Sequence, residues 1–288
     1  GAIQLQQITP VLIQNFYNQR YESGRTDGKG GLSAKTIRNL HNMLHQAFEQ
    51  AKINGMILHN PTDNAVIPKQ TKREMRVLSV EEQNRLLQFI HLHRLGFAIL
   101  FDLATGLRIG ELCALKWSDV NFNKQTIKIS RTLQRIKKSI GEKVSEGGNT
   151  AILEGNVKTN SGFREIPVPD NVFSMLMQHK AIQEQEKICY AGIYQDNGYI
   201  FAMPMGTCVE PHTMRDALNY LLAAAGIEHA NFHALRHTFA TRAIENGVNV
   251  KTLSDILGHS QVQITMDLYC HTSLDLMRDS MNKLAELF

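Results

Sequence analysis

The first part of the chain combines apolar and polar positions with the spacing of two amphipathic helices. Apolar residues recur every three or four positions between Ile8 and Phe16, and a glycine-rich break follows at 28–31. Ser33 is a suitable N-cap for a second helix, which Asn54-Gly55 would end. The apolar stripe of this second helix consists of Ile37, Leu40, Leu44, Ala47, Phe48 and Ala51. The pattern therefore predicts a small helical domain.

The regular pattern is interrupted at residues 60–76, which contain two prolines and several basic side chains with little periodicity. Such a segment is typical of an exposed linker between domains. A chain of 288 residues with 43% apolar content is long enough for more than one hydrophobic core. We therefore predict a helical domain over 1–74 and a second domain over 75–288.

Helical patterns also dominate the second domain. The letters SVEE at 79–82 form a capping-box pattern that begins a helix, and a more apolar helix is predicted over 95–104. The letters WSD at 117–119 are predicted to end the next short helix. Further helical patterns cover 170–189, 212–225, 233–246, 249–257, 260–268 and 272–286.

Between these helices lie segments that alternate like strands. Residues 118–122 and 126–132 are predicted to pair, and 151–157 and 163–168 are predicted to be extended as well. A polar, glycine-containing stretch separates the two pairs, which indicates a β-hairpin insertion at about 131–157. A short strand is predicted at 199–202. The fold class predicted is α+β, mainly α with a small antiparallel β-sheet.

Composition narrows the class of protein. No stretch approaches the roughly 20 continuous apolar residues of a membrane span, and the N-terminus lacks a signal-peptide pattern, so we expect a cytoplasmic protein. Gly1-Ala2 is typical of a cloning remnant, and we expect natural sequence to precede it. The cysteines have no paired CxxC spacing, which favours reduced thiols; they are Cys113, Cys189, Cys208 and Cys270.

The net charge of +4 is unevenly distributed. Residues 1–74 hold 9 Lys and Arg against 5 Asp and Glu, which leaves 22 against 22 in the rest of the chain. An N-terminal excess of this kind is expected of a segment that lies on phosphates, although a solvated basic surface is the commoner explanation for so small an excess.

Two segments contain candidate phosphate-binding cations. Segment 104–111 reads ATGLRIGE and puts Arg108 after a glycine turn, where its planar donors can face a phosphate; Glu111 lies one helical turn on. Segment 157–167 reads VKTNSGFREIP and puts Lys158 in a turn between two strands, from which it can reach a DNA groove. Taken singly, a surface arginine and a solvated lysine are the simpler interpretations.

Two further segments add histidines and a tyrosine. Segment 233–241 reads HALRHTFAT, so that His233 and Arg236 share one helical face. Its two histidines resemble part of a zinc helix, but an alanine stands where HExxH requires glutamate. Segment 257–260 reads LGHS, and Tyr269 follows His259 by ten positions. Alone, a tyrosine in an apolar helix is more often a core residue.

Taken in order, the residues Arg, Lys, His-x-x-Arg, Gly-His and Tyr resemble the active-site set of the tyrosine recombinase, or phage integrase, family. The resemblance covers 75–288, and 1–74 is similar to the family's core-type-site DNA-binding domain. The long polar hairpin is most similar to integrases of conjugative transposons. The resemblance implies that Tyr269 is the nucleophile and that the phosphate is activated by Arg108, Lys158, His233, Arg236 and His259.

Phosphoryl chemistry is consistent with these assignments. Arg108 and Arg236 can neutralise charge that builds on the phosphate, whereas the sequence has no acidic ligand cluster for a metal, so no cofactor and no metal are predicted. Because free tyrosine has a pKa of about 10, a neighbouring histidine or the positive field of the site must help to remove its proton, and His233 is the predicted base. Lys158 would protonate the leaving 5′-oxygen, and His259 would bond the phosphate. The product implied is a 3′-phosphotyrosyl linkage.

The partners follow from the same resemblance. Double-stranded DNA is the expected substrate, with Lys35, Arg38 and Arg164 as predicted DNA contacts. The resemblance implies a homotetramer on two DNA sites, in which the helix at 272–286 docks on a neighbouring protomer; packing on its own domain is the simpler alternative. It also implies an accessory excision protein, a further N-terminal arm-binding domain, and integration and excision of a mobile element on the bacterial nucleoid.

Three other functions remain open on the sequence. A type IB topoisomerase would use similar chemistry but would relax supercoiled DNA regardless of sequence. A DNA-binding regulator without activity would bind a specific site and form no covalent adduct. A zinc hydrolase that uses some of the 12 histidines would contain metal when purified.

Overall fold

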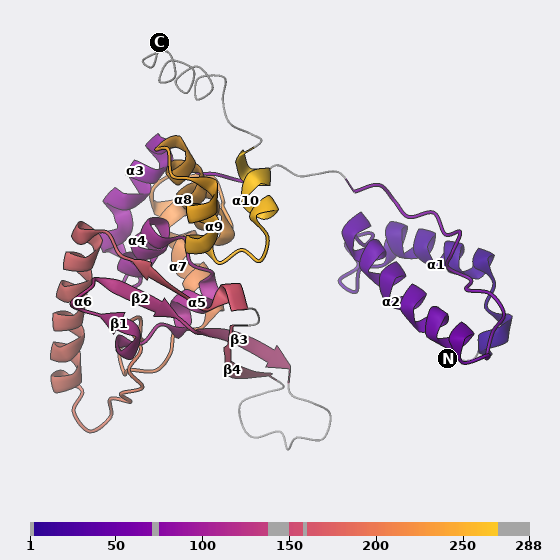
Figure 1. Cartoon of the computed structure of the whole chain (residues 1–288). Helices are drawn as coiled ribbons and strands as arrows, with labels where there is room; N and C mark the ends of the chain where they lie inside the picture. Colours follow the sequence, from indigo (N-terminus) through magenta and orange to yellow (C-terminus); the bar gives the residue numbers. More distant parts are fainter. Residues whose placement is uncertain (1–2, 71–74, 138–149, 158–159, 270–288) are drawn as a thin grey trace, which may run out of the picture. The chain divides into compact units, whose positions relative to one another are not determined.

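The computed structural model describes all residues except 1–2, 71–74, 138–149, 158–159 and 270–288. The chain divides into two compact units, Gly1–Glu74 and Met75–Phe288. Figure 1 shows the elements of each unit. No helix within the described ranges is both long enough and apolar enough to cross a bilayer.

Two α-helices form the N-terminal unit, and both begin at side-chain caps. The Thr9 hydroxyl accepts from Leu12 N at the start of α1 (Pro10–Ser23), and the Ser33 hydroxyl accepts from Thr36 N at the start of α2 (Ala34–Ile53). A 3₁₀ turn, η1 (Leu5–Gln7), precedes them. The apolar core of this unit is formed by Ile13, Tyr17, Ile37 and Phe48. Most of the stripe predicted for α2 faces this small core, since Leu40 and Leu44 also pack against it, whereas Ala47 is exposed.

The C-terminal unit contains the other helices. They are α3 (Val80–Phe89), α4 (Gly96–Thr105), α5 (Ile109–Ala114), α6 (Asp170–Cys189), α7 (Pro211–Ala224), α8 (His233–Glu245), α9 (Val250–Leu257) and α10 (Val262–Tyr269). The 3₁₀ turns are η2 (Ile90–Leu92), η3 (Trp117–Asp119) and η4 (Asn160–Gly162). The predicted capping box is present at the start of α3. Seven of the ten residues of α4 are buried, and α4 packs against α6, α7 and α8.

Two small antiparallel sheets accompany these helices. One has the order β1-β2-β5, from β1 (Val120–Asn121), β2 (Thr126–Ile129) and β5 (Arg164–Pro167), and the other pairs β3 (Arg131–Lys137) with β4 (Thr150–Asn156). In Figure 1 the β3–β4 hairpin extends away from the helices. The predicted fold class, mainly α with a small antiparallel sheet, is confirmed.

The strand expected over 126–132 is divided in the structure. Ser130 separates β2 from β3, which belong to different sheets. Because β4 pairs with β3 and β5 pairs with β2, the connection that carries Lys158 crosses between sheets. Two strands therefore flank Lys158 in the sequence, as predicted, although they belong to different sheets and do not pair with each other. Lys158 itself lies outside the described residues.

Two further local predictions are wrong. Helix α5 ends at Ala114, and WSD at 117–119 forms the separate turn η3, because Leu115 and Lys116 are extended. In place of a strand at 199–202 the structure has two isolated bridges, Lys116↔Tyr199 and Ala202↔Cys208. The predicted helix at 272–286 lies outside the described residues.

Candidate active site

Three arginines bond the backbone at the end of α9. In chain order, the carbonyl oxygens of residues 256–258 accept from Arg164 Nε at 2.6 Å, Arg236 Nη2 at 2.7 Å and Arg108 Nη2 at 2.9 Å. The last carbonyls of a helix have no partner within it and form the negative end of its dipole, so cationic donors stabilise this end. The three arginines come from β5, from α8 and from the residue that precedes α5. We call them the α9 arginine cap.

Two glycines make this packing possible. Gly258 has a φ of +65°, and a Cβ there would approach Arg164 Nη1 and Ser161 O to 2.8 Å. Gly106 ends α4 with a φ of +62°, and its carbonyl oxygen accepts from Arg236 Nη1 at 2.8 Å. Both positions require the left-handed conformation, which glycine adopts without steric cost.

The carboxylate of Glu111 links two members of the cap. Its side chain is 3% exposed, and it accepts from Arg108 N at 3.0 Å, Arg108 Nη1 at 2.7 Å and Arg164 Nη2 at 2.9 Å. Burial alone would raise the pKa of Glu111, but the hydrogen bonds and charge of Arg164, together with Arg108, lower it overall. Glu111 is therefore an anion that holds both guanidinium groups in place.

The expectation that Arg164 contacts DNA is not supported. Its side chain is only 6% exposed, and its guanidinium donates to Ile256 O, to Gly162 O and to both oxygens of Glu111. Four of its five N–H groups are thus committed inside the protein. Arg164 instead connects β5 to α5 and α9.

Arg236 lies deeper than Arg108. The Arg236 residue is 2% exposed, whereas the side chain of Arg108 is 42% exposed. Burial, followed by the charge of Arg108, lowers the pKa of Arg236 to about 9, which still leaves its guanidinium charged at neutral pH. Asp102 lies near Arg236 and is fully buried; within the described residues its carboxyl oxygens have no hydrogen-bond partner, and burial raises its pKa.

Three histidines surround Arg236. The rings of His233 and His237 meet edge to face, with centroids 4.4 Å apart. Both rings and that of His259 line a cavity of about 170 Å³, with Arg236 and Met75 among the other lining residues. Burial and the nearby arginines lower the pKa of all three, to about 4 for His237 and His259. Rings of this kind are neutral at neutral pH, so each has one N–H donor and one unprotonated nitrogen.

A hydrogen bond joins helix α10, which carries the tyrosine, to a histidine that lines this cavity. Nδ1 of His259 lies 2.8 Å from Oγ1 of Thr265, which is fully buried on α10. Helix α10 packs against α8 and α9 and ends at Tyr269. The side chain of Tyr269 lies outside the described residues.

The structure therefore gathers four of the six predicted active-site residues at one place: Arg108, His233, Arg236 and His259. Lys35 and Arg38 are exposed on α2 of the other unit. The sequence reasoning missed His237 and Thr265. The position of His237 four residues after His233 was a usable signal, but nothing in the pattern marked Thr265 as a neighbour of His259.

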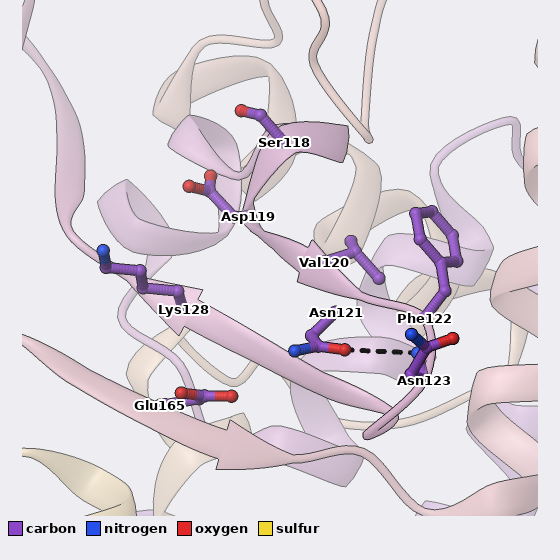
Figure 2. A pocket seen from close by; sticks show the side chains of 8 residues that line it. All are labelled: Ser118, Asp119, Val120, Asn121, Phe122, Asn123, Lys128 and Glu165. Atoms are coloured by element: carbon purple, nitrogen blue, oxygen red, sulfur yellow. Dashed lines mark hydrogen bonds between the residues drawn. The ribbon is translucent and has the colours of Figure 1, made fainter.

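Other candidate sites have different chemistry. A cavity of about 440 Å³ runs along β1, β2 and β5 and combines Asp119 and Glu165 with Lys128 (Figure 2). It shares no lining residue with the arginine and histidine site.

Among the described residues, one cluster could supply metal ligands. It lies in the N-terminal unit, where ligand atoms of His45, Glu49 and Asp63 lie within 4.8 Å of one another. These groups already have partners, however. Nδ1 of His45 bonds the Thr62 hydroxyl at 3.0 Å, and the Asn60 amide donates to Glu49 at 3.3 Å. Hydrogen bonds within the protein therefore account for the arrangement of these side chains.

Comparison with known proteins agrees with this geometry. Residues 76–274 match the model of the phage integrase family. The chain is 32% identical to a XerC-like tyrosine recombinase of Caldanaerobacter subterraneus subsp. tengcongensis, over 98% of this chain and 72% of that protein. It is 24% identical to the ICEBs1 integrase of Bacillus subtilis, over 98% and 72%.

Among solved structures, the Tn1549 transposon integrase in complex with transposon right end DNA is similar to this chain. The TM-score is 0.75 at 26% identity, over 99% of this chain and 88% of that one. The resemblance noted in the sequence is thus confirmed. The chain belongs to the phage integrase family and is a tyrosine-type site-specific DNA recombinase related to the integrases of conjugative transposons.

Proposed function

We propose that this recombinase cuts and rejoins double-stranded DNA through Tyr269, with Arg108, His233, Arg236 and His259 around the scissile phosphate. One observation carries the assignment: Arg108 and Arg236 bond adjacent carbonyls at the end of α9, and Arg236 lines a cavity together with three neutral histidines, beside the helix that ends at Tyr269. Such a site is cationic but retains a proton acceptor.

The two arginines are proposed to stabilise the pentavalent transition state. Arg108 keeps part of its guanidinium exposed, and Arg236 is held by two carbonyl groups, so both donor sets are arranged before the substrate binds. Preorganised donors of this kind require no rearrangement when charge develops on the phosphate. No metal ion is needed in this scheme, because the arginines supply the positive charge.

Proton transfers are proposed to involve His233 and Lys158. A lowered pKa keeps His233 neutral at neutral pH, so it can take the phenol proton of Tyr269 as the oxygen attacks phosphorus. The bond to the 5′-oxygen breaks, Lys158 protonates that oxygen, and a 3′-phosphotyrosyl linkage remains. Attack by a 5′-hydroxyl of a second DNA end reverses these steps without ATP.

DNA binding is proposed to involve both units. Lys35 and Arg38 are exposed on consecutive turns of α2 and can contact phosphates. A homologue supports this role for the family, since the Tn1549 integrase was solved in complex with transposon right end DNA. We propose that the reaction integrates and excises a mobile element on the nucleoid of a bacterial cell.

Assembly is proposed to be tetrameric on two DNA sites. The stripe within 272–286 consists of Leu274, Met277, Met281 and Leu284, and we propose that it docks on a neighbouring protomer. An accessory protein that favours excision is a further expected partner.

A nicked suicide substrate tests the function directly. Wild-type protein should form a covalent adduct on DNA that carries the recombination site, because loss of the short fragment beyond the nick prevents religation. Tyr269→Phe should bind the same DNA and form no adduct, because it lacks the phenol oxygen. An adduct from that variant would contradict the assignment of Tyr269.

The polarity and specificity of the adduct separate the competing functions. Nuclease digestion and mass spectrometry should find Tyr269 joined to a 3′-phosphate. Relaxation of supercoiled plasmids that lack the site would instead indicate a type IB topoisomerase. Specific binding without any adduct would indicate a regulator.

A further inference from the structure

We infer that Thr265 is a positioning residue for strand cleavage: its hydroxyl donates to Nδ1 of His259 and holds that ring in the tautomer whose proton is on Nε2. The inference rests on the proposed function, in which His259 bonds the scissile phosphate. Helix α10 would then both carry the nucleophile and orient the ring of His259.

The contact lies between α9 and α10. Thr265 Oγ1 is 2.8 Å from His259 Nδ1, and Thr265 is fully buried while the ring of His259 lines the cavity beside Arg236. His259 directly follows Gly258, whose carbonyl oxygen is held by Arg108. The bond therefore connects α10 to the α9 arginine cap.

The chemistry of the ring determines which atom donates. A neutral imidazole has one N–H donor and one bare nitrogen, and burial together with Arg236 and Arg108 keeps His259 neutral, with a pKa of about 4. A phosphate oxygen only accepts hydrogen bonds, so the ring must donate to it. Since Nδ1 faces Thr265, the donor is Nε2 and Nδ1 accepts from the hydroxyl.

The opposite tautomer would oppose catalysis. A proton on Nδ1 would leave the lone pair of Nε2 directed at an anionic phosphate oxygen, which repels it. A hydroxyl can rotate to donate, whereas a methyl group in the same place cannot. Thr265→Val keeps the shape of the side chain and removes only this donor, while Thr265→Ser keeps the donor.

The first measurement is the rate of adduct formation on the nicked substrate. We expect Thr265→Val to reduce the rate about tenfold or more, and Thr265→Ser to stay within about threefold of wild type. Thr105→Val is the matched control, because Thr105 is also a buried helical threonine and its hydroxyl bonds Phe101 O. That control should stay within about twofold. A rate for Thr265→Val equal to wild type would overturn the inference.

A double-mutant cycle separates positioning from packing. If Thr265 acts through His259, Thr265→Val should change the residual rate of His259→Phe by less than about twofold. An undiminished loss in the His259→Phe background would show that Thr265 acts through packing, which contradicts the inference.

The tautomer itself is observable without DNA or activity. Long-range ¹H–¹⁵N correlation spectra of the full chain, with His259 assigned by its loss in His259→Phe, should show a protonated Nε2 and a bare Nδ1. Thr265→Val should populate the other tautomer. A proton on Nδ1 in the wild type would refute the inference, even if the adduct assay upheld the proposed function. Conversely, a wild type that formed no adduct would remove the proposed function whatever the tautomer.

Discussion

Arg236 holds the site together, and under the proposed function it also binds the scissile phosphate. Its guanidinium bonds the carbonyl oxygens of Gly106 and Leu257, which end two different helices, and it remains charged although it is buried. A planar group with five N–H donors can bond both carbonyls and still present a donor to a phosphate. A lysine ammonium carries only three donors around one point.

Arg236→Lys should therefore separate charge from geometry. We expect the rate of adduct formation to fall about 100-fold or more, with DNA affinity changed by less than about threefold, because the positive charge remains but the donor arrangement is lost. Arg242→Lys is the control, since Arg242 lies on the same helix and bonds Glu245 and Leu78 O. Equal rates for Arg236→Lys and wild type would contradict this role.

The histidines make stability depend on pH. The pKa of His237 is lowered to about 4, whereas the unfolded chain binds that proton near the ordinary histidine value of 6.5. The unfolded state therefore holds more protons between these values, so the free energy of unfolding is fully present above about pH 6.5 and falls as pH decreases toward 4.

Replacement of His237 by phenylalanine should weaken this dependence. Within the described residues Nδ1 of His237 is buried and has no hydrogen-bond partner, so the aromatic ring can be kept while the titrating group is removed. Between pH 7.5 and 5, we expect His237→Phe to lose about 1 kcal/mol less stability than wild type, after a discount for partial exposure. Urea unfolding followed by circular dichroism measures it, with exposed His91→Phe as the control; identical pH profiles for His237→Phe and wild type would refute it.

At the scale of elements, the site depends on the end of α9. Three elements distant in sequence, β5, α8 and the start of α5, each send an arginine to consecutive carbonyls there, and Glu111 braces two of these arginines. Because His259 directly follows Gly258, the hydrogen bonds of the α9 arginine cap hold the backbone next to this histidine in place. Packing at the end of α9 therefore affects the position of the His259 ring.

Arg164→Met tests how much the cap contributes to stability and to adduct formation. The substitution leaves the buried Glu111 with Arg108 alone, and we expect the free energy of unfolding to fall by about 3 kcal/mol and adduct formation to slow. The exposed pair of Arg135 and Glu210 supplies the control, because solvent screens this pair and Arg135→Met should cost much less stability. Chemical denaturation measures the free energy of unfolding of both variants. Equal losses would contradict the expectation that the buried pair of Arg164 and Glu111 contributes more to stability than the exposed pair.

At the scale of the whole molecule, charge and chemistry are distributed between two units. The N-terminal unit carries the excess of basic residues, and the C-terminal unit contains the predicted active-site residues. Phosphate contacts by the first unit would release counterions and make affinity depend on salt without specifying sequence.

Salt dependence of binding tests the role of α2. Each of Lys35→Gln and Arg38→Gln should reduce the slope of log affinity against log salt concentration by about one, because each removes one phosphate contact. Lys52→Gln is the control on the same helix, since its ammonium already lies 3.3 Å from Glu49. Fluorescence anisotropy over a salt series measures all three; unchanged slopes for Lys35→Gln and Arg38→Gln would place the phosphate contacts elsewhere.

Local features were predictable from the sequence because they depend on neighbours a few residues away. The N-caps at Thr9 and Ser33 and the capping box after Ser79 involve bonds across three residues, and the stripe of α2 needs only helical periodicity. Of these, Ser33 and the capping box were predicted. The strand predicted over 126–132 is instead divided between two sheets, because strand pairing is decided by partners far along the chain.

The sequence by itself determined the family, through the order of its motifs, and most of the helices, through periodicity and caps. Only the tertiary structure decided which arginines are buried and which remain partly exposed. Arg108 meets Gly258 across 150 residues and Arg164 meets Ile256 across 92, distances that no local pattern encodes. Arg164 and Arg108 cannot be distinguished by residue type, but the structure buries Arg164 against Glu111 and leaves the side chain of Arg108 partly exposed.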